Sequence, residues 1–123
     1  MNDVFERSTQ IDGRREPRFN VHWRAGLKLP NGRIIDLRVK DISESGMGLV
    51  AAEAVAPSVT LEVRVRVPEP DNPTQAVDVT GTVKVAFVAM RGYDFQIGVT
   101  WVDRGDAGRH QMARWMRRMH LQF

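Results

Sequence analysis

The chain has 123 residues, of which 42% are hydrophobic and 27% are charged, a composition typical of one soluble globular domain. It contains no cysteine, which excludes disulfides, thiolate nucleophiles, iron–sulfur clusters and zinc sites with cysteine ligands. No apolar run reaches the roughly 20 residues that a membrane-spanning helix needs, and the N-terminus has charges where a secretory signal has an apolar core. We therefore expect a cytoplasmic protein without a membrane anchor.

Basic residues are concentrated at the C-terminal end of the chain. The net charge is +3, yet residues 104–123 hold five arginines against one aspartate. Arginine suits phosphate groups and guanine edges because its donors form a planar fork, but a high-GC genome also enriches arginine without any function. The tail has only two aromatic residues, Trp115 and Phe123, for stacking on bases. A basic nucleic-acid-binding barrel is therefore the least favoured function.

The N-terminal residues differ from the rest of the chain. Residues 1–18 show no sustained apolar periodicity and contain Gly13 and Pro17. Such a segment cannot bury enough apolar surface to order itself, so we predict a flexible N-terminal arm. Residues 1–12 of this arm precede the domain, which we assign to residues 13–123.

Alternation of apolar and polar residues begins at Phe19 and predicts six β-strands. They cover residues 19–29, 35–39, 47–51, 61–67, 77–87 and 95–101. Residues 43–46 and 68–73 are expected to be loops, the second because it holds three prolines. Phe87 is expected on the same face as the alternating valines before it. Short connections between strands of this kind predict an all-β fold, a six-stranded antiparallel barrel.

The apolar period changes near the C-terminus. It becomes helical and predicts an α-helix over residues 105–121, with an apolar stripe of Met112, Trp115, Met116 and Met119. A helix of this length is marginal alone, so we expect it to dock on the barrel. Its tryptophan and methionines would otherwise offer a groove to a partner protein. Trp23 and Trp101 lie on apolar strand faces and are expected in the core.

Motifs of catalysis are missing from the sequence. His22, His110 and His120 have no spacing suited to a shared metal ion. No glycine-rich loop precedes Lys-Ser or Lys-Thr as in phosphate-binding loops, and no serine lies in a nucleophile elbow. We predict that the protein is not an enzyme and uses no metal or cofactor.

Two short motifs remain. Residues 14–18 read Arg-Arg-Glu-Pro-Arg and contain Arg-x-x-x-Arg, while residues 41–46 read Asp-x-Ser-x-x-Gly. With this arginine content, roughly two matches to the first pattern are expected by chance, and residues 114–118 provide the second match. The Asp-x-Ser-x-x-Gly pattern is expected by chance roughly 0.03 times. The second motif, which falls between two predicted strands, is therefore the more informative one.

In this order, and separated by one predicted hairpin, the two motifs resemble those of the PilZ domain, the bacterial receptor module for cyclic di-GMP. The segments Gly-Met-Gly-Leu at 46–49 and Phe-Gln-Ile-Gly-Val at 95–99 are also similar to that family, as is a helix after six strands. The resemblance covers residues 13–120. It implies a receptor in second-messenger signal transduction that binds cyclic di-GMP as a ligand and passes the signal to an unidentified protein partner.

The resemblance also implies which residues contact the nucleotide. Arg14 and Arg18 would be the two motif arginines, and Arg15 would add a contact; their guanidinium groups suit the two phosphates and the O6 and N7 atoms of guanine. Asp41 would accept hydrogen bonds from the N1 and N2 edge of guanine. Without a ligand, the arginines would be only a solvated arm.

Two further residues of the serine motif are implied in the site. Ser43 would donate or accept a hydrogen bond beside Asp41, and Gly46 would let the backbone approach the ligand, with a φ that a Cβ disfavours. Asp41 and Ser43 could instead only cap a turn. The alternative function is a PilZ-like protein-interaction module that works without nucleotide.

Overall fold

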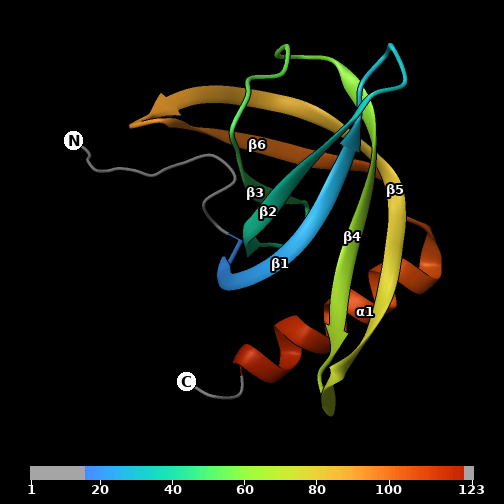
Figure 1. Cartoon of the computed structure of the whole chain (residues 1–123). Coiled ribbons are helices and arrows are strands. Elements are labelled where there is room, and N and C mark those ends of the chain that lie inside the picture. Colours follow the sequence, from blue (N-terminus) through green and yellow to red (C-terminus); the bar gives the residue numbers. More distant parts are fainter. Residues whose placement is uncertain (1–15, 121–123) are drawn as a thin grey trace.

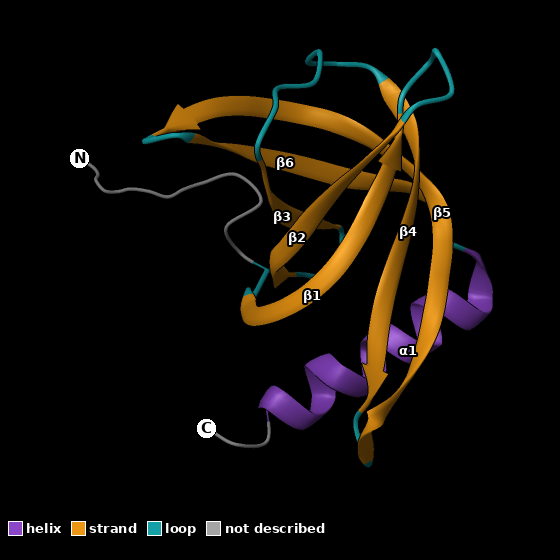
Figure 2. Cartoon of the chain, viewed as in Figure 1, coloured by secondary structure: helices purple, strands orange, loops and turns teal. Residues whose placement is uncertain are grey.

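The computed structural model describes residues 16–120 and contains six strands followed by one helix (Figures 1 and 2). The elements are β1 (Phe19–Lys28), β2 (Ile34–Ile42), β3 (Gly46–Ala51), β4 (Thr60–Glu69), β5 (Asn72–Arg91), β6 (Asp94–Asp103) and α1 (Gly105–His120). Neighbouring strands are antiparallel and form a closed ring in the order β1-β2-β3-β6-β5-β4. The six predicted strands and the C-terminal helix are confirmed.

The interior of the ring is filled by the alternating apolar side chains of the strands. In β4, Leu61, Val63, Val65 and Val67 are buried while the residues between them are exposed. Trp23 on β1 is buried, as predicted. Full burial of one such side chain contributes about 1.5–3 kcal/mol, so the ring interior is the main source of stability.

Helix α1 packs on the ring through its apolar stripe. Met112 is buried, and Trp115 packs edge-on against Trp23, with ring centroids 5.7 Å apart and planes at 62°. The indole N–H of Trp115 donates to the carbonyl oxygen of Pro68. Trp115 therefore anchors the helix to the ring. Within residues 16–120, no helix is long and apolar enough to cross a bilayer.

The loop predicted at residues 68–73 is wrong, because β4 and β5 extend to Glu69 and from Asn72. β1 pairs only with residues 62–65 of β4, so Pro68 has β5 as its one strand neighbour. Proline is tolerated at such an edge because no second ladder loses a hydrogen bond. The extended hairpin lies beside α1 (Figure 1). Its tip binds two helix residues: Arg114 donates to Glu69 and Asp71, and Arg118 to Asp71 and the carbonyl oxygen of Pro70.

The prediction that the Phe87 side chain lies on the same face as the valines before it is also wrong. The pairing of β5 with β6 shifts register between Val85 and Phe87, and such a bulge moves the following side chains to the opposite face. Phe87 is 52% exposed, whereas Val88 packs against the core. The outer surface thus gains an aromatic ring that strict alternation places inside.

Arg114→Ala is expected to reduce the free energy of unfolding by about 0.5–1 kcal/mol, the upper range for partly exposed ion pairs. Arg114 lies 3.0 Å from a carboxylate oxygen of Glu69 and 3.3 Å from one of Asp71, so the substitution removes two of the links between helix and hairpin. Urea denaturation measures the effect. The matched control is Arg117→Ala, at an exposed position of the same helix. Equal losses in the two variants would contradict this role.

Candidate functional site

The turn at residues 43–46 connects β2 to β3 and is held by hydrogen bonds within the turn and from β6. The backbone N–H and the hydroxyl of Ser43 both donate to the carbonyl oxygen of Gly46, at 3.0 and 3.4 Å. The N–H of Trp101 on β6 donates to the carbonyl oxygen of Ser45 at 2.8 Å. Ser43 is only 3% exposed, so its hydroxyl shapes the turn.

Gly46 lies where β3 and β6 approach each other closely. A Cβ on Gly46 would lie 2.1 Å from the carbonyl oxygen of Val99 on β6, far inside van der Waals contact. Its φ is not positive, so the backbone angle expected from the sequence is wrong. Glycine is needed here because β6 passes next to the start of β3.

Arg18 and Asp41 lie together on the outer surface. An Nη atom of Arg18 donates to a carboxylate oxygen of Asp41 at 2.8 Å. The Arg18 side chain is 58% exposed and that of Asp41 is 13% exposed. A guanidinium has five N–H donors, so most of those of Arg18 stay available to a ligand. The structure therefore brings together one residue from each motif, 23 positions apart.

Glu16, which is not among the predicted site residues, also contacts the turn. Its carboxylate accepts hydrogen bonds from the hydroxyl of Ser45 at 2.8 Å and from its N–H at 3.1 Å. Burial alone would raise the pKa of Glu16, but these hydrogen bonds and the charge of Arg18 lower it below its usual value. Residues 16–18, predicted as part of the flexible arm, thus lie against the turn. Arg14, Arg15 and residues 1–12 lie outside the described residues.

A row of four residues crosses the outer face from Asp41. Asp41 on β2 pairs with Gly48 on β3, Gly48 with Gly98 on β6, and Gly98 with Phe87 on β5. The Asp41 carboxylate lies 2.7 Å from where a Cβ of Gly48 would be, and the Phe87 ring 2.1 Å from where one of Gly98 would be. The Asp41 carboxylate and the Phe87 ring therefore lie over the two glycines, which are both buried.

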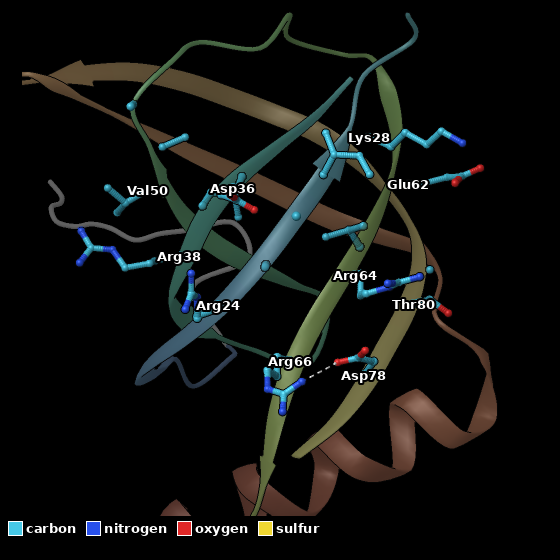
Figure 3. A pocket seen from close by; sticks show the side chains of 18 of the residues that line it. Arg24, Lys28, Asp36, Arg38, Val50, Glu62, Arg64, Arg66, Asp78 and Thr80 are labelled. Atoms are coloured by element: carbon cyan, nitrogen blue, oxygen red, sulfur yellow. Dashed lines mark ion pairs between the residues drawn. The ribbon is translucent and has the colours of Figure 1, made fainter. Parts of the chain in front are cut away.

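A hollow of about 1120 Å³ lies over β1, β2, β4 and β5 and reaches the end of β3 (Figure 3). Among residues 16–120, neither a residue predicted for the site nor an aromatic side chain lines it. Its charges are mixed, because Arg24, Arg38 and Arg64 alternate with acidic residues such as Asp36 and Asp78 (Figure 3). Without a stacking surface or a uniform charge, this hollow is a poorer candidate than the turn.

Histidines and acidic residues do not gather into a metal site in the part of the chain that the structure describes. His22, His110 and His120 are exposed, and among residues 16–120 no three His, Cys, Asp or Glu side chains are arranged to hold a metal ion. The chemistry of the candidate site thus comes from arginine, carboxylate and backbone groups.

Comparison of the sequence with family models decides the family. The model of the PilZ domain matches residues 12–118. The chain belongs to the PilZ domain family. This match includes both motifs, the six strands and most of α1, and it confirms the resemblance drawn from residues 14–18 and 41–46. Comparison with curated proteins finds no significant match.

Solved structures share the fold of this PilZ domain at low sequence identity. The inhibitor of motility MotI/DgrA from Bacillus subtilis has a TM-score of 0.77 at 14% identity, over 98% of this chain and 57% of that one. The PilZ domain of Escherichia coli YcgR with c-di-GMP has a TM-score of 0.68 at 13% identity, over 90% of this chain and 94% of that one. Escherichia coli YcgR in complex with c-di-GMP has a TM-score of 0.71 at 16% identity, over 91% of this chain and 48% of that one. This chain therefore spans about half the length of MotI and YcgR.

Proposed function

We propose that this PilZ domain is a receptor for cyclic di-GMP and not an enzyme. One observation carries the proposal: Arg18 and Asp41, predicted from two separate motifs, lie 2.8 Å apart on an accessible surface. Both YcgR structures with this fold contain c-di-GMP, which supports the assignment. The same proposal places the protein in the bacterial cytoplasm.

The chemistry of the nucleotide matches the surface around Arg18. Cyclic di-GMP has two phosphates, which need donors, and two guanines, which have an acceptor edge and a donor edge. We assign Arg18, with Arg14 and Arg15 before it in the sequence, to the phosphates and to guanine O6 and N7. We assign the Asp41 carboxylate to guanine N1 and N2. Binding then exchanges the Arg18–Asp41 ion pair for contacts of both residues with the nucleotide.

Ser43 and Gly46 have a different role in this proposal. Ser43 is buried and bonded to the Gly46 carbonyl, and Gly46 lies tight against β6. We assign both residues to the shape of the turn, which fixes where the nucleotide meets the backbone. The serine motif therefore combines one ligand contact, Asp41, with two residues that form the surface.

Phe87→Ala is expected to weaken the binding of cyclic di-GMP by about three- to tenfold, the worth of one aromatic stacking contact. Phe87 is half exposed at the end of the Asp41–Gly48–Gly98 row, where its ring offers a face to guanine. Fluorescence titration measures the affinity. Tyr93→Ala is the matched control, because Tyr93 is 99% exposed at the turn after β5. Equal effects of the two variants would remove Phe87 from the site.

The second part of the proposal is that binding changes the N-terminal arm and thereby the surface offered to a protein partner. Glu16 contacts Ser45 in the turn, and Arg18 contacts Asp41 just before it. A ligand that displaces Asp41 from Arg18 alters these contacts, and a rearranged segment is a common output of receptors without catalytic activity.

Limited digestion with trypsin tests nucleotide binding and the response of the arm together. Saturating cyclic di-GMP is expected to slow cleavage after Arg14 and Arg15 far more than cleavage after Arg7, because only the former adjoin the ligand. Mass spectrometry of timed samples identifies each cut. Equal protection at all three sites, or none, would count against the arm as the responding element.

A nucleotide-independent interaction module is the second candidate function. It is favoured by the contacts of Glu16 with Ser45 and of Arg18 with Asp41, which hold residues 16–18 on the domain through protein groups. Nucleic-acid binding gains no support from the tail. Arg104 is buried, and Arg114 and Arg118 are engaged with the β4–β5 hairpin, so three of the five tail arginines are committed within the chain.

A further inference from the structure

Arg104 is a buried arginine between β6 and α1. Its side chain is only 5% exposed, and burying a charged group is costly unless partners compensate for the lost water. Desolvation lowers the pKa of Arg104, an effect that the charge of Glu44 opposes. A buried charge at this position needs a reason beyond packing, since an apolar side chain of similar length would fill the space.

The contacts of Arg104 lead to the turn of the candidate site. One Nη donates to the backbone carbonyl of Glu44 at 2.9 Å, and the guanidinium lies 5.5 Å from the centroid of the Trp101 ring. The Glu44 carboxylate is 3.8 Å away but 69% exposed, so it contributes little. The other Nη lies 3.8 Å from the sulfur of Met112 in α1. The carbonyl of Glu44 is thus the closest oxygen that Arg104 binds.

The carbonyl oxygens of three consecutive turn residues, Glu44, Ser45 and Gly46, each accept a hydrogen bond. Ser45 binds the N–H of Trp101, Gly46 binds Ser43, and Glu44 binds Arg104. The first two bonds come from the sheet and from the turn itself. Arg104 supplies the only one of the three that comes from the segment leading into α1.

We propose that Arg104 is a positioning residue: it holds the 43–46 turn in the geometry that binds the nucleotide and links that turn to the first turns of α1. This inference rests on the proposed function. Because the carbonyl of Glu44 and the sulfur of Met112 contact one guanidinium, a shift of the turn on binding changes the packing of Met112 in α1.

Two substitutions of the same kind separate positioning from stability. Arg104→Met keeps the length of the side chain and removes its donors, and we expect it to weaken cyclic di-GMP binding at least tenfold. Arg114→Met, within α1, is the matched control, because Arg114 binds the hairpin and not the turn; it is expected to lower the melting temperature and leave the affinity within twofold. Arg104→Lys is expected to weaken binding less, since an ammonium still donates to the carbonyl but lacks the planar fork that lies over the Trp101 ring.

Hydrogen exchange supplies a readout that does not need the nucleotide. In the free protein, Arg104→Met is expected to speed amide exchange at residues 44–46, and Arg114→Met is not. With wild-type protein, cyclic di-GMP is expected to slow exchange at the turn and at residues 106–112.

Wild-type affinity in Arg104→Met, or equal losses in both methionine variants, would overturn the positioning role. If Arg104→Met does not fold, wild-type affinity in Arg104→Lys overturns it. If the wild-type chain binds no cyclic di-GMP, the proposed function fails. The role of Arg104 in fixing the turn is then tested by amide hydrogen exchange of the two methionine variants without nucleotide. Exchange at residues 44–46 that does not change in Arg104→Met refutes this role.

Discussion

Arg18→Ala is expected to weaken the binding of cyclic di-GMP at least tenfold while leaving the free energy of unfolding almost unchanged. A hydrogen bond to a charged group contributes about 1.5–3 kcal/mol, and about 1.4 kcal/mol corresponds to a factor of ten in affinity. Stability is spared because Arg18 is 58% exposed and its pair with Asp41 lies at the surface, where such pairs contribute little. Calorimetric titration and urea denaturation of the same sample measure the two quantities.

Two variants serve as controls for this prediction. Arg18→Lys keeps the charge but not the planar fork, so it is expected to recover little affinity. Arg114→Ala removes an arginine from the other Arg-x-x-x-Arg match, which the structure places on the β4–β5 hairpin, and it is expected to leave affinity unchanged. If Arg114→Ala abolishes binding while Arg18→Ala does not, the assignment of the arginine motif is wrong.

Gly46→Ala is expected to lower the free energy of unfolding markedly, although it adds only one methyl group to the turn. The new Cβ would lie 2.1 Å from the Val99 carbonyl oxygen and 3.3 Å from the Cα of Thr100, both backbone atoms that cannot rotate away. The β3–β6 pairing must shift, and overpacking of this kind costs about 1–3 kcal/mol. Because the turn shifts with β3, nucleotide affinity is expected to fall as well.

The control for Gly46→Ala is a second strand glycine with room around it. A Cβ on Gly26 would meet a methyl group of Ile34 at 3.2 Å, and Ile34 is 63% exposed, so this side chain can move. Gly26→Ala is therefore expected to change the free energy of unfolding by no more than about 0.5 kcal/mol. A Gly46→Ala variant as stable as Gly26→Ala would contradict the close approach of β3 and β6.

The strands of this fold could be predicted because their information is local. Alternation over Leu61–Val67 appears directly in the sequence and matches the burial of β4. The bulge before Phe87 and the extension of β4 beyond Pro68 could not be predicted, because both depend on which strand lies alongside. Strand pairing is set by the closure of the whole ring, which no short segment encodes.

The candidate site divides in the same way. Asp41 and Arg18 belong to motifs with recognisable spacing, so the sequence locates them. Glu16, Phe87 and Arg104 show no pattern: Glu16 meets Ser45 29 positions away, and Arg104 meets Glu44 60 positions away. Their roles depend on contacts that exist only after folding. The positive φ expected for Gly46 was wrong for a related reason, since the constraint there comes from a neighbouring strand.

Isothermal titration calorimetry of the whole chain with cyclic di-GMP tests the central claim most directly. We predict a saturable heat with one or two nucleotides bound per protomer, no comparable heat with GMP, and loss of most of the affinity in the Arg18→Ala and Asp41→Ala variants. No saturable heat with folded wild-type protein, or the same affinity in all three proteins, would contradict a cyclic di-GMP site at Arg18 and Asp41.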